Sequence, residues 1–265
     1  MFSPQRNAHT RGSLVALAVA AASVITALAA TAHDADARRL SCRSVSADRA
    51  LPYWARQRNV TVLADSVLQS GADGLHNVMA CRRVSIRGRP ALMLRIAERE
   101  FRIEGRRVAP LVVIGLGHNS LWERNRHRYD FWAARFDADA RRLVDTLRRL
   151  GATQIVWVTI REPRPEFLTP AGRAELGTYS WYFPYVNERL RRLDARRDDV
   201  SLADWTAVSS RRGLTYDSIH LTPTGARLMA RTIRSAIDAE ARRQALARQP
   251  RSMAPAIATG RRVAG

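Results

Sequence analysis

Residues 111–115 read LVVIG, a run of apolar and largely β-branched side chains that ends at a glycine. Similar short runs stand at 60–64 (VTVLA), 155–159 (IVWVT) and 200–203 (VSLA). Runs that are apolar at nearly every position are typical of strands buried on both faces, as in a parallel sheet. We therefore predict that these four segments are strands of one mostly parallel sheet.

Helical patterns lie between these strands and after the last of them. They cover residues 131–150, 185–197 and 223–246, the last with Thr222 as N-cap and Pro223 at the first helical position. Alternating strands and helices predict the α/β class, here a single-domain, three-layer α/β/α sandwich. The buried stripe of the first helix is predicted to consist of Phe131, Phe136, Ala140, Leu143, Val144 and Leu147.

The composition fits a globular chain: 265 residues, of which 46% are hydrophobic and 26% charged. The net charge is +20, and all 44 basic residues are arginine. These arginines are spread over the whole length, with no compact basic block interleaved with stacking aromatics. We therefore expect no specific nucleic-acid partner, although the charge favours acidic surfaces.

The N-terminus has the pattern of an export signal. Arg6 and Arg11 precede residues 13–32, which are small or apolar and carry no charge. We predict a signal peptide over residues 1–32 and a secreted or cell-envelope location. An uncleaved membrane anchor is the alternative, because the apolar run is almost long enough to span a bilayer. Membrane contact is expected only through this segment.

The two cysteines, Cys42 and Cys81, would both reach an oxidising compartment, which favours one disulfide over two unpaired thiols. That bridge would tie residues 33–57 to a domain spanning 58–247, followed by a flexible tail at 248–265. The two thiols and six scattered histidines show neither HExxH nor CxxC spacing. We expect no metal, no other cofactor and a monomeric chain.

Polar residues with catalytic potential stand where the predicted strands end. Ser66 follows the first strand closely, Asn119 follows the second, and Asp217 and His220 precede the last helix. In an α/β sheet, chemistry gathers at the carboxyl edge of the strands. A serine, an amide and an Asp-x-x-His together supply a nucleophile, an oxyanion donor and a base with its orienting carboxylate. Each is weak alone, because such residues more often serve as caps or turns.

The order and spacing of these blocks resemble the SGNH superfamily of serine hydrolases, also called GDSL-like lipases and acylhydrolases, over most of residues 58–238. Residues 64–66 (ADS) match the family's Gly-Asp-Ser, with alanine in place of glycine. Residues 117–119 (GHN) match Gly-x-Asn, and 217–223 (DSIHLTP) match Asp-x-x-His and its usual continuation. The resemblance implies an SGNH/flavodoxin-like sandwich.

The resemblance also implies the roles of the site residues. Ser66 is the nucleophile, His220 the base that takes its proton, and Asp217 the carboxylate that orients His220. The oxyanion hole would consist of the backbone N–H groups of Ser66 and Gly88 and the side-chain amide of Asn119.

Three further residues stand close to the assigned positions in the sequence. Gly71 and Gly74 are alternatives to Gly88, although they follow the nucleophile too closely to lie at the next strand end. His118 is predicted to be a packing or rim residue.

The predicted function is an exported serine esterase or acylhydrolase that cleaves a short-chain carboxylic ester through an acyl-enzyme on Ser66. Its substrate would be an ester-bearing small molecule, lipid or acylated glycan. One alternative is an O-acyltransferase acting on cell-envelope glycans, and another is a catalytically weak binding domain, suggested by Ala64. A dinucleotide loop at residues 115–117 (GLG) is disfavoured, because Ser120 occupies the third glycine position.

Overall fold

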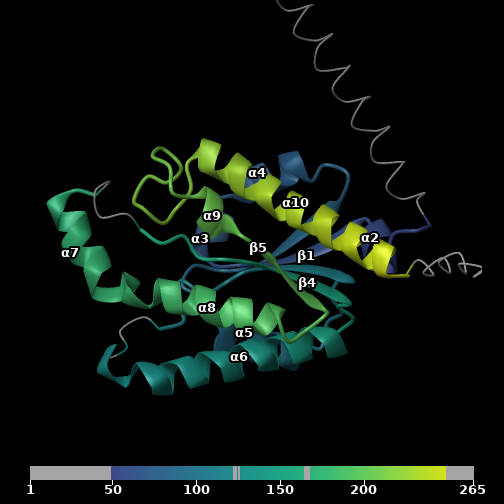
Figure 1. Ribbon diagram of the computed structural model, residues 1–265, viewed down its shortest axis with the longest axis horizontal. Coiled ribbons are helices and arrows are strands. Elements are labelled where there is room, and N and C mark those ends of the chain that lie inside the picture. Colours follow the sequence, from purple (N-terminus) through teal and green to yellow (C-terminus); the bar gives the residue numbers. More distant parts are fainter. Residues whose placement is uncertain (1–48, 122–123, 125, 164–167, 249–265) are drawn as a thin grey trace, which may run out of the picture. The chain divides into compact units, whose positions relative to one another are not determined.

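A five-stranded parallel sheet lies at the centre of the part of the chain that the structure describes (Figure 1). The structure is a computed structural model that describes residues 49–121, 124, 126–163 and 168–248. The predicted signal peptide at 1–32, Cys42 and the tail beyond Arg248 lie outside the described residues. The Cys42–Cys81 bridge therefore stays a prediction.

The strand order is β2-β1-β3-β4-β5, and every neighbouring pair is parallel. The chain leaves β1 to one side and then crosses to the other, so the topological switch point lies between β1 and β3. The four predicted strands and the α/β/α sandwich are confirmed. The strands are β1 (Asn59–Ala64), β2 (Arg83–Gly88), β3 (Leu111–Gly115), β4 (Gln154–Val158) and β5 (Val200–Ala203).

The strand β2 was not among the four segments predicted from apolar runs, because its sequence alternates polar and apolar residues. It lies at the edge of the sheet, where Val84 and Ile86 are half-buried and pack against the core. An edge strand needs only this weaker pattern, since one of its sides has no neighbouring strand.

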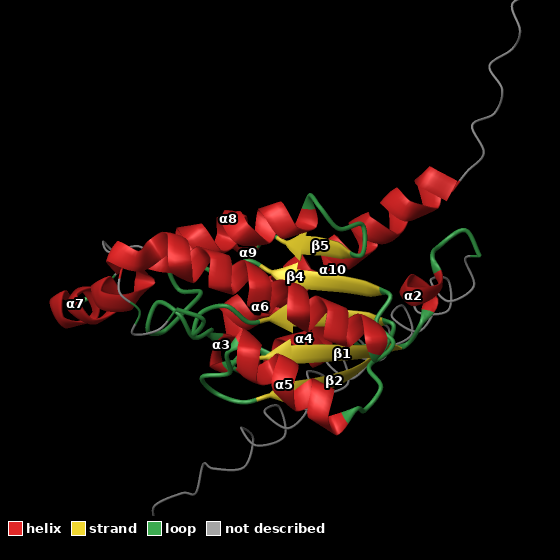
Figure 2. Cartoon of the chain, turned by 90° about the horizontal axis from the view of Figure 1, so that it is seen from below, coloured by secondary structure: helices red, strands yellow, loops and turns green. Residues whose placement is uncertain are grey.

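Helices cover both faces of the sheet (Figures 1 and 2). The three predicted helices correspond to α6, α8 and α10, with ends shifted by two or three residues at most. The helix α5 was not predicted, because charged residues dominate its sequence and only three of its side chains are buried. The helices are α2 (Tyr53–Arg56), α3 (Ser66–Gln69), α4 (Ala72–Val78), α5 (Leu94–Glu104), α6 (Tyr129–Arg149), α7 (Pro170–Tyr179), α8 (Phe183–Asp194), α9 (Trp205–Val208) and α10 (Pro223–Arg248), with 3-10 turns η1 (Arg126–Arg128) and η3 (Ser180–Tyr182).

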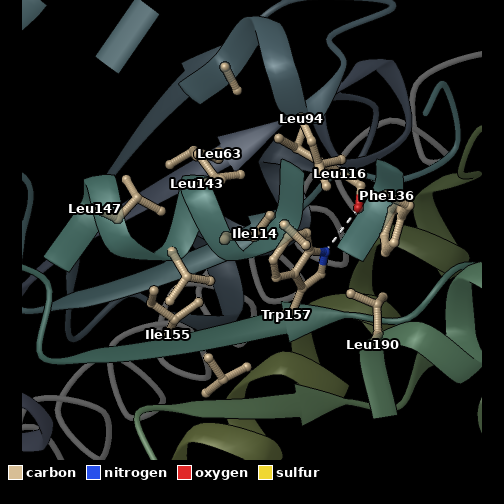
Figure 3. Close-up of a cluster of buried hydrophobic side chains, with 14 of the residues drawn as sticks. Leu63, Leu94, Ile114, Leu116, Phe136, Leu143, Leu147, Ile155, Trp157 and Leu190 are labelled. Atoms are coloured by element: carbon tan, nitrogen blue, oxygen red, sulfur yellow. Dashed lines mark hydrogen bonds between the residues drawn. The ribbon is translucent and has the colours of Figure 1, made fainter. Parts of the chain in front are cut away.

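One apolar core fills the space between the sheet and helices α5, α6 and α8 (Figure 3). Trp157 of β4 is fully buried there, and its indole Nε1 donates a hydrogen bond to the Leu116 carbonyl at 2.9 Å. This bond satisfies the one polar atom of the largest side chain in the cluster, so the ring is buried without an unpaired donor.

The predicted apolar stripe of α6 is correct except at its start. The other five residues of that stripe are buried, but Phe131 is 49% exposed. Phe131 lies in the first turn of α6, and the guanidinium of Arg128 covers its ring at 4.7 Å. The prediction that Phe131 belongs to the core is therefore wrong, because its ring lies outside the apolar cluster and contacts the guanidinium of Arg128.

A second core lies between the opposite face and helices α4 and α10. A Cβ at Gly74 would lie 2.6 Å from the backbone of Ala226, so the glycine permits close contact between α4 and α10. No helix in the part of the chain that the structure describes is long and apolar enough to span a membrane.

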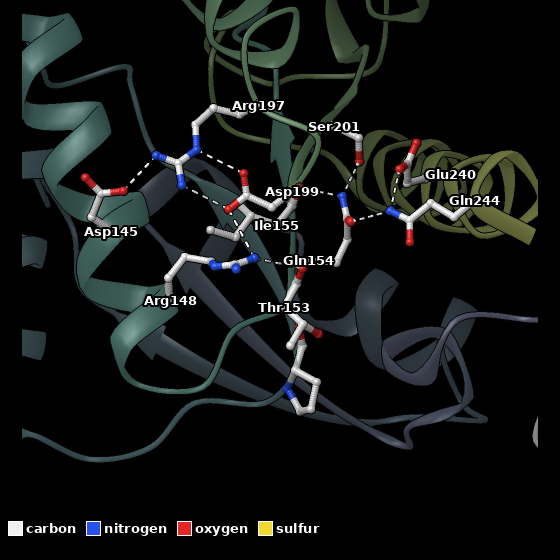
Figure 4. A network of polar contacts seen from close by, with 11 residues as sticks. Asp145, Arg148, Thr153, Gln154, Ile155, Arg197, Asp199, Ser201, Glu240 and Gln244 are labelled. Atoms are coloured by element: carbon white, nitrogen blue, oxygen red, sulfur yellow. Dashed lines mark hydrogen bonds and ion pairs between the residues drawn. The ribbon is translucent and has the colours of Figure 1, made fainter. Parts of the chain in front are cut away.

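A network of hydrogen bonds and ion pairs lies at the amino edge of the sheet (Figure 4). Gln154, at the start of β4, is fully buried and accepts a hydrogen bond from Gln244 Nε2 at 2.8 Å, which connects α10 to the sheet. Arg197 makes two hydrogen bonds to Asp199, at 2.9 and 3.0 Å, and one to Asp145 of α6 at 2.7 Å. These contacts connect α6, α10 and the start of β5 at the edge opposite the strand ends that carry Ser66 and Asn119.

The ionisation of Asp199 makes the stability of the fold depend on pH. Partial burial raises the pKa of its carboxyl, but the hydrogen bonds and positive charges of Arg197 and Arg148 outweigh burial, so the pKa lies below its ordinary value. The ionised carboxylate therefore stabilises the fold above a pH of about 4, and this contribution is lost as the pH falls through the folded-state pKa.

We expect Asp199→Asn to lower the free energy of unfolding by about 1–2 kcal/mol at neutral pH, and by less as the pH falls below about 4. Urea unfolding at pH 7 and pH 3 measures this difference. Asp238→Asn is the matched control, because Asp238 pairs with Arg234 only at 3.7 Å on the surface. A difference that persists unchanged at pH 3 would contradict the prediction.

Candidate active site

Ser66 lies at the carboxyl edge of the sheet, at the switch point between β1 and β3. The strand β1 ends at Ala64, and Asp65 caps the short helix α3 by accepting a hydrogen bond from Val67 N at 3.0 Å. Ala64 is not among the described residues with a positive φ, so this turn does not need the glycine that the related motif carries. The replacement by alanine leaves Ser66 as the first residue of α3.

The structure places Ser66, His220 and Asp217 in one hydrogen-bonded chain. His220 Nε2 lies 3.0 Å from Ser66 Oγ, and His220 Nδ1 lies 2.5 Å from Asp217 Oδ2. The serine and the histidine are 154 positions apart in the sequence. These distances place a base within reach of a hydroxyl and a carboxylate behind the base, as the sequence blocks predict.

Asp217 is held by the backbone of its own loop as well as by the histidine ring. Its Oδ1 accepts hydrogen bonds from Ile219 N at 3.0 Å and His220 N at 2.7 Å. Partial burial raises the pKa of the Asp217 carboxyl, but the hydrogen bonds from His220 and Ile219 outweigh burial, so the pKa lies below its ordinary value. Asp217 is therefore a carboxylate at neutral pH and can hold Nδ1 of the imidazole in its protonated form.

The segment that carries His220 leads directly into α10. Thr222 caps this helix as predicted, because its Oγ1 accepts a hydrogen bond from Gly225 N at 3.2 Å. Tyr216 stacks on the imidazole of His220, with ring centroids 5.7 Å apart and an angle of 16° between the planes. The other side of Tyr216 is open, since the residue is 70% exposed.

Asn119 lies beside Ser66 at the neighbouring strand end, and Asp65 determines the orientation of its amide. Asn119 Nδ2 donates a hydrogen bond to Asp65 Oδ2 at 3.3 Å. A carboxylate only accepts, so the amide nitrogen and not the amide oxygen must face Asp65. The second N–H of the same amide remains for an oxyanion.

Gly88 lies at the end of β2, paired with Ala64 in the sheet register. Its φ is +146°, and a Cβ there would lie 1.9 Å from the Ala64 carbonyl oxygen, so only glycine fits. The alternatives have other roles. A Cβ at Gly71 would lie 2.9 Å from Leu221 Cδ1, and Gly74 packs against α10. Of the three glycines, only Gly88 lies at a strand end next to β1.

His118 lies between the catalytic edge and the core. Its ring packs edge-on against Phe183 at 5.5 Å, and its Nδ1 is 3.5 Å from Asp65 Oδ2. The segment containing Gly115 and Gly117 enters a turn at 118–121. A dinucleotide loop would lead straight into a helix whose N-terminus binds the phosphates, so this segment does not have that form.

The candidate site lies in one cleft of about 950 Å³, a volume in the range of small-molecule sites. Ser66, Asn119, Asp217 and His220 all line it. Among the described residues, no group of three or more His, Cys, Asp or Glu side chains is arranged to hold a metal ion.

The parallel sheet with helices on both faces is an α/β/α sandwich, and Ser66, His220 and Asp217 lie at its carboxyl edge. No family model matches the sequence, and no curated protein matches it. The fold is similar to a GDSL-like lipase from Bacteroides thetaiotaomicron, with 14% identity, 74% of this chain and 95% of that chain covered, and a TM-score of 0.55. It is also similar to an acetyl xylan esterase, with 15% identity, 67% and 98% covered, and a TM-score of 0.53. The described domain therefore has the fold of the SGNH hydrolases.

Arg161 and Tyr216 are among the residues of the cleft that were not identified from the sequence. Arg161 follows β4 at the same edge as Ser66 and is buried, and Tyr216 covers His220. The position of Arg161, three residues after the end of β4, was the only sequence signal for it. Nothing in the local pattern distinguishes Tyr216 from an ordinary loop residue.

Proposed function

We propose that this protein is an exported serine esterase that hydrolyses short-chain carboxylic esters through an acyl-enzyme on Ser66. The observation that carries the proposal is the hydrogen-bonded chain in which His220 lies 3.0 Å from Ser66 Oγ and 2.5 Å from the Asp217 carboxylate. The esterase and the lipase with similar folds support an ester as the substrate.

In the first half of the reaction, Ser66 Oγ attacks the ester carbonyl carbon while His220 Nε2 takes the hydroxyl proton. Asp217 stabilises the imidazolium that forms and keeps Nδ1 as the protonated nitrogen. The tetrahedral intermediate then collapses, and His220 gives its proton to the departing alkoxide. The products are an alcohol and a Ser66 ester.

The negative charge that develops on the carbonyl oxygen needs donors already in place. The backbone N–H of Ser66, the backbone N–H of Gly88 and the free N–H of the Asn119 amide are the proposed donors. Loss of one such donor typically costs roughly 3 kcal/mol of transition-state stabilisation. The hydrogen bond from Asn119 to Asp65 supports this role, because it holds the amide nitrogen in position before substrate arrives.

The second half of the reaction releases the acid. Water attacks the acyl-enzyme while His220 takes one of its protons, and the proton then returns to Ser66 Oγ as the acid leaves. An alcohol in place of water would give acyl transfer, so the acceptor alone separates the esterase from the O-acyltransferase alternative. The volume of the cleft supports a substrate that is larger than its acyl group.

A panel of esters tests the proposal. The purified protein is given p-nitrophenyl acetate, butyrate and octanoate and an acetylated glycan, each with and without an added sugar acceptor. We expect faster release of nitrophenol from acetate and butyrate than from octanoate, with free acid as the product. Acylated sugar as the main product would favour the acyltransferase, and no turnover of any ester would favour a binding domain.

Export is part of the proposal and rests on the apolar, uncharged residues 13–32 behind a basic start. Expression with this segment in a bacterial host should yield a shortened chain outside the cytoplasm.

Intact mass before and after reduction and alkylation tests the Cys42–Cys81 bridge. Two thiols that alkylate without reduction in the native exported protein would rule the bridge out.

A further inference from the structure

The segment that carries Asp217 and His220 belongs to no helix and to no strand of the sheet. Residues 209–220 form turns and bends, with one isolated bridge between Thr215 and Leu221. Ser218, between the two catalytic candidates, has a φ of +75°, a conformation that a serine seldom adopts. This segment therefore needs contacts from elsewhere to hold the imidazole in place.

Arg161, three residues after the end of β4, makes such contacts with this segment. Its Nη1 donates hydrogen bonds to the Ser218 carbonyl at 3.2 Å and to the Thr215 hydroxyl, and its Nη2 lies 3.4 Å from the Arg211 carbonyl. The residue is only 4% exposed. Burial of a guanidinium is costly unless hydrogen bonds offset the lost hydration, so the bonds from Nη1 and Nη2 favour a close association of Arg161 with this segment.

The backbone before Arg161 is itself fixed. Asn187 of α8 is fully buried, accepts a hydrogen bond from Ile160 N at 2.7 Å and donates one to the Ile160 carbonyl at 2.8 Å. Thr206 Oγ1 donates a further hydrogen bond to the same carbonyl at 2.8 Å. Arg161 therefore extends from an anchored segment, and its side chain connects the rigid sheet to the loop.

We propose that Arg161 is a positioning residue that fixes the 211–220 loop and thereby holds His220 within reach of Ser66. The inference rests on the proposed function for its effect on turnover. It does not rest on that function for its effect on the loop, because the contacts of Arg161 are present in the protein without substrate.

Arg161→Met tests this role, since methionine keeps an apolar stem and loses every donor. We expect kcat to fall about tenfold or more while KM changes less than threefold, because substrate binding remains and alignment is lost. Arg161→Lys, which keeps one donor group, should recover part of kcat. The lysine variant also keeps the proposal testable if the methionine variant does not fold.

Hydrogen exchange supplies a readout that does not depend on activity. The amides of Tyr216, Ile219 and His220 are hydrogen-bonded within the loop, and their exchange should become faster in Arg161→Met. Arg82→Met is the matched control. Arg82 donates hydrogen bonds to two backbone carbonyls, those of Gln57 and Ala55, at the opposite edge of the sheet, so its loss should leave the loop and kcat unchanged.

Three outcomes would overturn the proposal. In the first, exchange in the loop and kcat both stay at wild-type values in Arg161→Met. In the second, KM rises with kcat unchanged, which would make Arg161 a substrate-binding residue. In the third, Arg82→Met loosens the 211–220 loop equally. A wild-type protein without esterase activity would refute the proposed function, and exchange in the loop would still decide the role of Arg161.

Discussion

Replacement of Ser66 by alanine is expected to lower kcat for ester hydrolysis by on the order of 10⁴-fold or more, because the variant has lost the hydroxyl that forms the acyl-enzyme in the proposed mechanism. The variant should fold normally. Asp65 caps α3 through its own side chain, and alanine is a strong helix former. Initial rates with p-nitrophenyl acetate, together with the melting temperature, measure both effects.

A serine-directed fluorophosphonate tests the same residue without turnover. In the wild type, Ser66 Oγ should attack phosphorus and displace fluoride, and peptide mapping should place the adduct on Ser66. Ser85→Ala is the matched control, because Ser85 is an exposed serine of the edge strand β2 and should label like the wild type. Equal labelling of Ser66→Ala, or an adduct on another residue, would disprove the nucleophile assignment.

The second large effect is expected at Asp217. In Asp217→Asn, the amide oxygen can still accept the hydrogen bonds from Ile219 N and His220 N, so the loop should keep its shape. The amide nitrogen would then face His220 Nδ1 and favour the tautomer with its proton on Nε2, which cannot accept the proton of Ser66. The comparable change in a serine protease with a Ser-His-Asp triad lowers kcat about 10⁴-fold.

We expect a smaller but still large effect here, a decrease in kcat on the order of 10² or more, equivalent to roughly 3 kcal/mol of barrier, with an unchanged melting temperature. Steady-state kinetics and thermal unfolding measure the two quantities. Asp238→Asn, at a partly exposed aspartate of α10, controls for the loss of one negative charge. An Asp217→Asn enzyme that retains more than about half of its kcat would show that His220 works without the carboxylate.

Prediction from the sequence succeeded where the signal was local. The strands β1, β3 and β4 were recognisable because burial on both faces requires apolar side chains at successive positions. The edge strand β5 was recognisable only as a shorter run, and α10 from Thr222 and Pro223 at its start. Prediction missed β2 and α5 because each buries only a few side chains. Phe131 was misassigned because periodicity shows which side of a helix is apolar and not how far along the helix the core extends.

The sequence by itself determined that Ser66 and Asn119 stand at strand ends of a parallel sheet, since both follow apolar runs whose carboxyl ends must share an edge. Only the tertiary structure decided how the neighbouring groups meet there. Asp65 orients the amide of Asn119 across 54 positions, and Arg161 reaches the loop of Asp217 and His220 across a similar separation. Hydrophobic periodicity repeats every few residues and can be read along the chain, whereas these hydrogen bonds depend on which strand ends become neighbours, and that is settled only when the sheet assembles.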